Sequence, residues 1–158
     1  MLWKAMMTER PVTILVLCTG NSARSVMAEC LINRLGDGRW RAFSAGSHPS
    51  GAVNPLTIAV LVENGHPVEG LRSKSWDEFA APDAPRMDLV MTVCDNAAGE
   101  VCPIWPGHPA KIHVGFPDPA AAVGTLEDRL AMFRTVYALI EAKVRRLIDI
   151  GPDRAGEL

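Results

Sequence analysis

The sequence has no long apolar run and no cluster of basic residues. Its 158 residues carry 16 Lys and Arg against 18 Asp and Glu, a formal net charge of −2. Nothing therefore predicts binding to nucleic acid, and no apolar stretch has the length of a membrane-spanning helix. The first ten residues lack the apolar segment and cleavage site of a signal peptide, and Met1, Met6 and Met7 are alternative starts. We expect a cytoplasmic protein whose residues 1–10 form a flexible tail.

The usual metal-binding motifs are also missing. No two of the four cysteines are spaced as C-x-x-C, and the four histidines do not lie near them at the spacing of zinc ligands. In a reducing compartment a framework of permanent disulfides is not expected. Cys30 lies at the edge of an apolar helix face and is predicted to be a packed hydrophobic residue. Cys18, Cys94 and Cys102 remain candidates for catalytic or redox chemistry.

The pattern of apolar residues predicts one α/β domain. The length suits a single domain, residues 1–158, with its folded part at 11–150 and a C-terminal tail at 151–158 that should fray. Apolar runs at 12–17 and 88–94 predict two strands, and the short stretches 40–45 and 111–114 are interpreted as two more. Helical patterns lie at 22–36, 54–64 and 125–150. The long last helix has a predicted apolar seam: Leu126, Leu130, Phe133, Tyr137, Ile140, Val144 and Leu147.

Alternation of strands and helices predicts a three-layer sandwich. The expected sheet has four parallel strands in the order 2-1-3-4, with helices on both faces and right-handed crossovers. Ligands of such sheets bind at the carboxyl ends of the strands, where the strand order reverses. Cys18, Cys94 and Asp118 follow strands 1, 3 and 4. We therefore expect these three side chains to meet at one edge of the sheet.

The stretch CTGNSARS, residues 18–25, follows the first strand and opens a helical pattern. The five residues between Cys18 and Arg24 give the spacing of a loop that wraps around one tetrahedral oxyanion. Backbone N–H groups and the helix N-terminus supply positive potential, and the guanidinium of Arg24 can grip two oxygens. The same surroundings favour the thiolate of Cys18, which makes it the predicted nucleophile.

The other residues of this loop are predicted to bind or support the oxyanion. Gly20 can take a positive φ, Asn21 tolerates the left-handed conformation and can brace the loop, and Ser25 could donate a hydrogen bond to the thiolate. The complete predicted oxyanion-binding set is Thr19, Gly20, Asn21, Ser22, Ala23, Arg24 and Ser25.

Two further features extend this chemistry. Asp118, in the loop GFPDPA, is either an ordinary turn residue or an acid that protonates a leaving oxygen. Cys94 and Cys102 are eight residues apart, which is about 12 Å on an intact helix. A disulfide needs Cα atoms about 5.5–6 Å apart, so a bond between them would require the segment to loop or unwind. We infer a redox-switched loop and a thiol relay.

Together, CTGNSARS, the Cys94/Cys102 pair and GFPDPA resemble the thioredoxin-coupled arsenate reductases, which are built on the low-molecular-weight tyrosine phosphatase fold. The resemblance covers residues 12 to about 150. It implies an enzyme of arsenic detoxification in which Cys18 attacks arsenate, with Asp118 as general acid. Cys94 would then attack Cys18 and expel arsenite, and Cys102 would attack Cys94. Thioredoxin would finally reduce the exposed Cys94–Cys102 disulfide.

The resemblance also bears on cofactors and partners. Some members bind potassium beside the loop, and Asn21, Glu29 and Ser44 match three positions of that site; a solvated charge and a strand-end hydroxyl are the alternative interpretation of the last two. The cysteine spacing is one residue longer than the best-known thioredoxin-coupled pattern, so glutaredoxin with glutathione is an alternative electron donor. We expect a monomer, no tightly bound cofactor, and competition by phosphate or sulfate.

Two other functions remain open. A low-molecular-weight tyrosine phosphatase would use the same Cys18, Arg24 and Asp118 on phosphotyrosine. That family usually has a cysteine before the loop arginine, a proline after the following serine and aromatic residues after Asp-Pro. This sequence has Ala23, Val26 and the pair Ala120-Ala121 there. A non-enzymatic oxyanion or redox sensor is the second alternative, and it predicts no turnover of arsenate.

Overall fold

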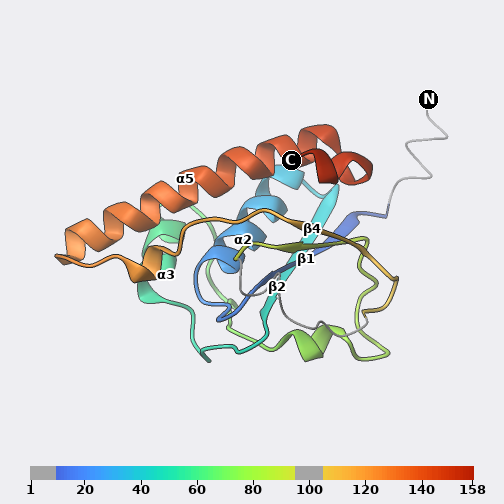
Figure 1. Ribbon diagram of the computed structural model, residues 1–158, viewed down its shortest axis with the longest axis horizontal. Helices are drawn as coiled ribbons and strands as arrows, with labels where there is room; N and C mark the ends of the chain where they lie inside the picture. Colours follow the sequence, from blue (N-terminus) through green and yellow to red (C-terminus); the bar gives the residue numbers. More distant parts are fainter. Residues whose placement is uncertain (1–9, 95–104) are drawn as a thin grey trace.

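A four-stranded parallel sheet forms the centre of the computed structural model, which describes residues 10–94 and 105–158 (Figure 1). The strands lie in the order β2-β1-β3-β4, which confirms the predicted 2-1-3-4 arrangement. Their bounds are β1 (Val12–Cys18), β2 (Trp40–Gly46), β3 (Leu89–Thr92) and β4 (Ala110–His113). β3 is shorter than the apolar run suggested, because Val93 and Cys94 already leave the strand.

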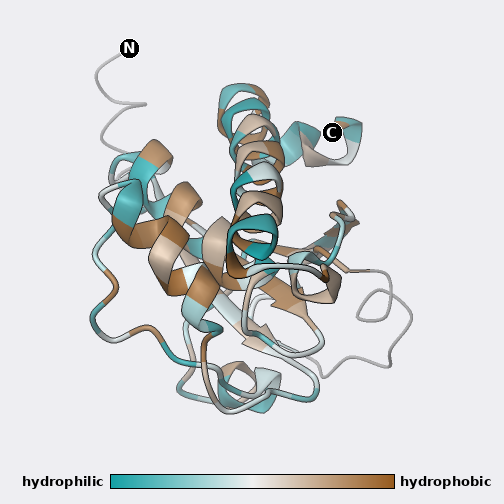
Figure 2. Ribbon diagram, turned by 90° about the vertical axis from the view of Figure 1, so that its left-hand side faces the viewer, coloured by the Kyte–Doolittle hydropathy of each residue, from teal (hydrophilic) through white to brown (hydrophobic). Residues whose placement is uncertain are grey.

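Three helices pack on one face of the sheet. They are α2 (Arg24–Gly36), α3 (Pro55–Glu63) and α5 (Leu126–Ile150), and α5 runs along both of the others (Figure 1). Ile14 and Val16 of β1 form a buried core with the inward side chains of these helices. The predicted seam of α5 is confirmed from Phe133 onward, whereas Leu126 at its start is largely exposed. Figure 2 shows α5 carrying both hydrophobic and hydrophilic residues, while the strands are mostly hydrophobic.

The other face of the sheet is covered differently. Leu15 and Leu17 of β1 pack there against Trp76, Phe79 and Trp105, and the two indole rings meet edge-on with centroids 6.0 Å apart. Trp76 and Phe79 belong to the short 3-10 helix η1 (Trp76–Phe79), which is capped by the Ser75 hydroxyl, an acceptor for the Asp77 N–H. Within the described residues, this 3-10 helix and its loops cover this face of the sheet.

Side-chain caps mark the N-termini of α3 and α5 but not that of α2. The Asn54 side chain accepts a hydrogen bond from the Leu56 N–H and Pro55 is the first residue of α3, as predicted. At the start of α5, Thr125 and Asp128 form a reciprocal capping box. In contrast, no side chain caps α2 at Ala23. The N-terminal amides of α2 are therefore left for another partner.

The prediction that the C-terminal tail frays is wrong. Residues Pro152–Glu157 form the 3-10 helix η3 after Gly151 turns the chain with a φ of 83°. Ala155 is buried against α5, and Leu158 packs on the same core, which holds the segment in place. Residues 1–9 of the expected flexible tail at 1–10 lie outside the described residues, and so does the segment from 95 to 102 that was expected to switch with the Cys94–Cys102 bond. No helix in the described part is long and apolar enough to cross a membrane.

Candidate active site

The nucleophile candidate lies at the carboxyl end of the central strand. Cys18 is the last residue of β1, and a loop of five residues leads from it to Arg24, the first residue of α2. The Cys18 side chain is almost fully buried. A cavity of about 210 Å³ opens beside it. Its walls are formed by Cys18, Thr19, Gly20, Ser22, Ala23, Arg24, Asp118 and Ala120.

A directed chain of hydrogen bonds reaches the Cys18 sulfur. The Lys74 N–H donates to Asn21 Oδ1 at 2.9 Å, which fixes the orientation of that amide. Asn21 Nδ2 then donates to Ser25 Oγ at 2.8 Å and to Ser44 Oγ at 3.0 Å. Ser25 Oγ lies 2.9 Å from Cys18 Sγ, and its hydroxyl can donate to the sulfur when Cys18 is a thiolate. The loop thus offers a hydrogen-bond donor to a thiolate.

The backbone of the loop differs in one detail from the prediction. The residue with a positive φ is Asn21, at 47°, and Gly20 is not among the residues of that kind. The tight position is instead Gly46, which pairs with Cys18 across β2 and β1. A Cβ atom at Gly46 would collide with the Thr19 carbonyl oxygen and lie 3.1 Å from the Asn21 N atom. Gly46 was not predicted as a site residue, because its approach to the loop follows from the register of β1 and β2.

Arg24 joins the oxyanion loop to the loop that carries the acid. Its Nη1 donates to the Phe116 carbonyl oxygen at 3.1 Å, and its Nη2 lies 3.8 Å from Asp118 Oδ2. Asp118 Oδ1 accepts from the Ala120 N–H at 3.0 Å and so begins the 3-10 helix η2 (Pro119–Ala121). The Asp118 side chain is 47% exposed. The structure therefore places Cys18, Arg24 and Asp118 around one cavity.

The described cysteines differ sharply in their surroundings. Cys94 is buried beside the oxyanion loop, with its Sγ 3.6 Å from the hydroxyl of Thr19, the residue after the nucleophile. Cys30 packs in the core behind α2, where burial raises the pKa of its thiol to about 12. Cys18, Cys30 and Cys94 are all free thiols. Cys102 lies outside the described residues.

This combination of loop, arginine and acid is found in known proteins. Residues 13–153 match the model of the low molecular weight phosphotyrosine protein phosphatase family. The chain belongs to this family.

Relatives within the low molecular weight phosphatase family include reductases. The chain is 39% identical to the arsenate reductase of Bacillus licheniformis over 141 residues, covering 88% of this chain and 96% of the relative. It superposes on the crystal structure of an arsenate reductase from Archaeoglobus fulgidus with a TM-score of 0.67 and 29% identity, covering 86% and 98% of the two chains. A thioredoxin-dependent arsenate reductase of Corynebacterium glutamicum shares the fold, with a TM-score of 0.65, 24% identity, and coverage of 89% and 62%.

The potassium site implied by the family resemblance does not fit the residues of this chain. Asn21, Ser44 and Glu29 do form a chain of contacts, because the Ser44 hydroxyl donates to Glu29 Oε1 at 2.5 Å. The cation beside Glu29, however, is the Lys74 ammonium, 3.9 Å from the same oxygen. A second cation there would be repelled by Lys74. The described residues also contain no cluster of three or more acidic, His or Cys side chains placed to hold a metal ion.

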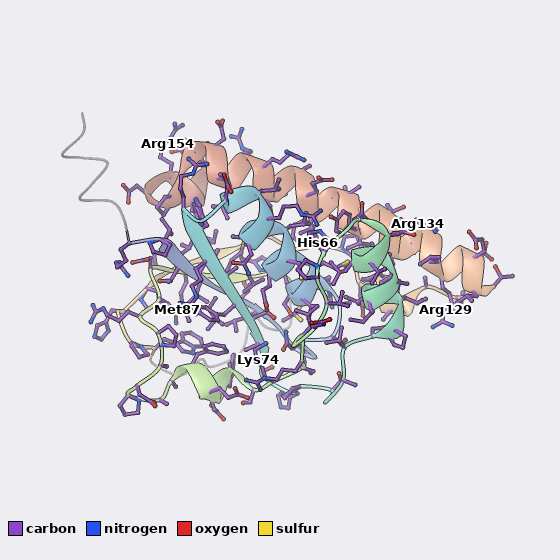
Figure 3. All side chains as sticks on the ribbon, turned by 180° about the vertical axis from the view of Figure 1, so that it is seen from behind. His66, Lys74, Met87, Arg129, Arg134 and Arg154 are labelled. Carbon is purple, nitrogen blue, oxygen red and sulfur yellow. The ribbon has the colours of Figure 1, made fainter. Side chains whose placement is uncertain are left out.

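Lys74 and Ser73 are further residues that support the oxyanion loop. Both lie in the connector before η1, near the carboxyl end of β2, where Gly46 N–H donates to the Lys74 carbonyl oxygen (Figure 3). The Ser73 hydroxyl donates to the Gly20 carbonyl oxygen at 2.9 Å. The oxyanion loop is therefore held from behind by a segment more than fifty residues later in the chain. No local pattern in the sequence points to this contact.

Proposed function

We propose that this chain is an arsenate reductase in which Cys18 is the nucleophile and Cys94 the resolving thiol. The observation that carries the proposal is the position of Cys94, buried with its sulfur 3.6 Å from the Thr19 hydroxyl at the edge of the oxyanion loop. A phosphatase resolves its cysteine intermediate with water, whereas a reductase needs a second thiol at that place. The relatives that match most of the chain are named arsenate reductases, which agrees with this choice.

The first step forms a sulfur–arsenic bond. The Cys18 thiolate attacks the arsenic of arsenate, while Arg24 and the loop amides hold the remaining oxygens. One hydroxyl leaves arsenic and takes a proton from Asp118, so that it departs as water. Asp118 is suited to this because it lines the same cavity as Cys18 and is partly exposed to solvent. The product is a covalent Cys18–arsenate adduct, with arsenic still in oxidation state V.

The second step carries the reduction. Cys94 attacks the Cys18 sulfur, the sulfur–arsenic bond breaks, and its electron pair stays on arsenic. Arsenic is thereby reduced by two electrons and leaves as arsenite, while the two thiols are oxidised to a Cys18–Cys94 disulfide. Cys102 then attacks Cys94 and frees Cys18 for another cycle.

An external dithiol must reduce the final disulfide. We propose thioredoxin as this partner, with glutaredoxin and glutathione as the alternative donor. The family resemblance supports thioredoxin, and the Corynebacterium glutamicum neighbour is described as thioredoxin-dependent. Since the cycle needs free thiols, the proposal places the protein in the reducing cytoplasm. Phosphate and sulfate should compete with arsenate, because the cavity offers the same amides and guanidinium to each of these anions.

A residual phosphatase activity is the second function that the geometry favours. Cys18, Arg24 and Asp118 surround the cavity in the arrangement that hydrolysis of a phosphate ester would use. Ala120 lines that cavity and Ala121 is exposed beside it, so no aromatic side chain follows Asp118-Pro119 to stack on a phosphotyrosine ring. We therefore expect slow hydrolysis of a small ester such as p-nitrophenyl phosphate.

Arsenate-dependent oxidation of NADPH, coupled through thioredoxin and thioredoxin reductase, tests the proposal. The wild type and the matched control Cys30→Ser should turn over, and Cys18→Ser and Cys94→Ser should not. Cys102→Ser should release one arsenite per enzyme and then stop. If glutaredoxin supports turnover and thioredoxin does not, only the donor changes. Hydrolysis of p-nitrophenyl phosphate without arsenate reduction by either donor, and with Cys94 dispensable, would establish a phosphatase instead.

A further inference from the structure

Lys74 contacts two residues that lie behind the oxyanion loop, Asn21 and Glu29. Its backbone N–H donates to Asn21 Oδ1 at 2.9 Å, and its ammonium lies 3.9 Å from Glu29 Oε1. Both charged side chains are largely removed from solvent, with 10% of the Lys74 side chain and 18% of the Glu29 side chain exposed. The two oxygens that could ligate a cation behind the loop, on Asn21 and Glu29, are thus both engaged by one residue.

The charge of Glu29 and the charge of Lys74 each favour the charged form of the other residue. Burial raises the pKa of Glu29, and the Ser44 hydrogen bond and Lys74 oppose that rise. Burial likewise lowers the pKa of Lys74, and Glu29 opposes that fall. Arg72 also faces Glu29, but its guanidinium is exposed and bonded to Glu78 at 2.6 and 2.9 Å. Lys74 is therefore the cation that compensates the Glu29 charge, and removing one member of such a buried pair leaves the other uncompensated.

The pair is connected to the nucleophile through hydroxyl groups. The Ser44 hydroxyl donates to Glu29, so Ser44 can only accept from Asn21. The hydrogen bond from Asn21 to Ser44 and the one from the Lys74 N–H to Asn21 together hold the Asn21 amide in place. In this orientation the amide donates to Ser25. A charged Glu29 strengthens the bond from the Ser44 hydroxyl, because hydrogen bonds to a carboxylate are stronger than those to a neutral carboxyl group.

We propose that Lys74 is a built-in cation of the oxyanion loop, a positioning residue whose ammonium compensates the Glu29 charge behind the loop, so that this protein functions without an alkali cation. The inference concerns the support of the loop and does not depend on which oxyanion the loop binds. Its first readout is therefore stability, and its failure is distinguishable from a failure to reduce arsenate.

The test compares Lys74→Met with the wild type in potassium chloride and in tetramethylammonium chloride at equal ionic strength. The wild type should have the same melting temperature in both salts. Lys74→Met should melt lower in tetramethylammonium chloride and regain stability in potassium chloride, because its empty place beside Glu29 can take the ion. Its KM for arsenate, or Ki for phosphate, should rise about tenfold without potassium and recover with it.

Three controls make the result specific. Lys111→Met removes an equal charge from β4, where the ammonium lies over the Trp105 ring, and should show no response to potassium. Adding Glu29→Gln to Lys74→Met should abolish the response. Lys74→Arg should remain indifferent to potassium. A potassium-specific effect on the wild type would overturn the proposal, and this comparison needs no variant to fold. Loss of stability in Lys74→Met that potassium does not restore would also overturn it.

Discussion

The Ser25 hydroxyl lies 2.9 Å from the Cys18 sulfur and accepts a hydrogen bond from Asn21 at 2.8 Å. When Cys18 is a thiolate, Ser25 is the donor of the first contact, because a thiolate has no hydrogen to give. A hydroxyl that donates in this way stabilises a thiolate more than a thiol, because hydrogen bonds to charged groups are the stronger kind. The contact joins the last residue of β1 to the first turn of α2, so the fold itself sets its geometry.

Removal of this hydroxyl should slow the first step. Ser25→Ala deletes one charge-assisted hydrogen bond, worth about 1.5–3 kcal/mol, and should lower the rate of single-turnover arsenite formation by roughly 10- to 100-fold. Rapid quenching with detection of arsenite measures this rate. Ser50→Ala, which removes an exposed hydroxyl bonded to the Ala52 carbonyl oxygen, is the control. An unchanged rate in Ser25→Ala would show that the thiolate does not depend on this donor.

Replacement of the acid should separate catalysis from binding. Asp118→Asn keeps an oxygen for the Ala120 N–H but cannot protonate the leaving hydroxide, so single turnover should slow by roughly 10²- to 10⁴-fold. The Ki for phosphate should stay the same or fall, since a negative charge near the anion is removed. Asp83→Asn, at an exposed position, should change neither value. A large rise in the Ki of Asp118→Asn would instead indicate that Asp118 organises the loop.

An added methyl group at Gly46 should displace the oxyanion loop. In Gly46→Ala the new Cβ would collide with the Thr19 carbonyl oxygen and crowd the Asn21 N atom. We expect a loss of about 1–3 kcal/mol in the free energy of unfolding together with weaker phosphate binding. Gly156→Ala is the matched control, because its Cβ would meet no atom within 4 Å. Urea unfolding and phosphate titration of both variants provide the measurement, and equal behaviour would contradict the crowding.

The stability of the protein should fall as the medium is acidified below neutrality. His66 is buried with its Nε2 2.7 Å from the Tyr137 hydroxyl, and burial, aided by Arg34 and opposed by Glu141, lowers its pKa. The unfolded chain therefore binds a proton more readily than the folded protein. The stabilisation is complete above the unfolded pKa of about 6.5 and is lost as the pH falls through the lower folded value.

Urea unfolding across this range tests the assignment to His66. The wild type should lose stability between about pH 7 and pH 5, and His66→Gln should flatten that dependence. His48→Gln, a substitution at an exposed position, should leave the dependence unchanged. A slope that persists in His66→Gln would assign the effect to other groups.

The sequence predicted those parts of the fold that depend on local patterns. Continuous apolar runs located the first and third strands, short stretches between turn signals located the other two, and the handedness rule with the position of the switch point then gave their order. The Cys18 to Arg24 spacing and the position of Asp118 after the fourth strand identified three side chains that line one cavity. These features are local or follow from topology, and for that reason they can be found without coordinates.

Other features depend on contacts between distant segments. Lys74 and Gly46 act on the loop through positions that only the folded sheet brings near Asn21 and Thr19. The tail after Gly151 was expected to fray because it is a chain terminus, yet Ala155 in it is buried. The second face of the sheet could not be foreseen either, since the packing of Trp76 against Trp105 joins segments separated by 28 residues.

The N-terminus of α2 lacks the side-chain cap that α3 and α5 possess. An oxyanion bound against those amides completes the helix in the way that Asn54 and Thr125 complete the others. The substrate is then also a structural element, and its binding energy adds to the stability of the native state by mass action. Any tetrahedral anion that fits the loop, whether or not it reacts, should therefore make the protein harder to unfold in proportion to the logarithm of its concentration above its dissociation constant.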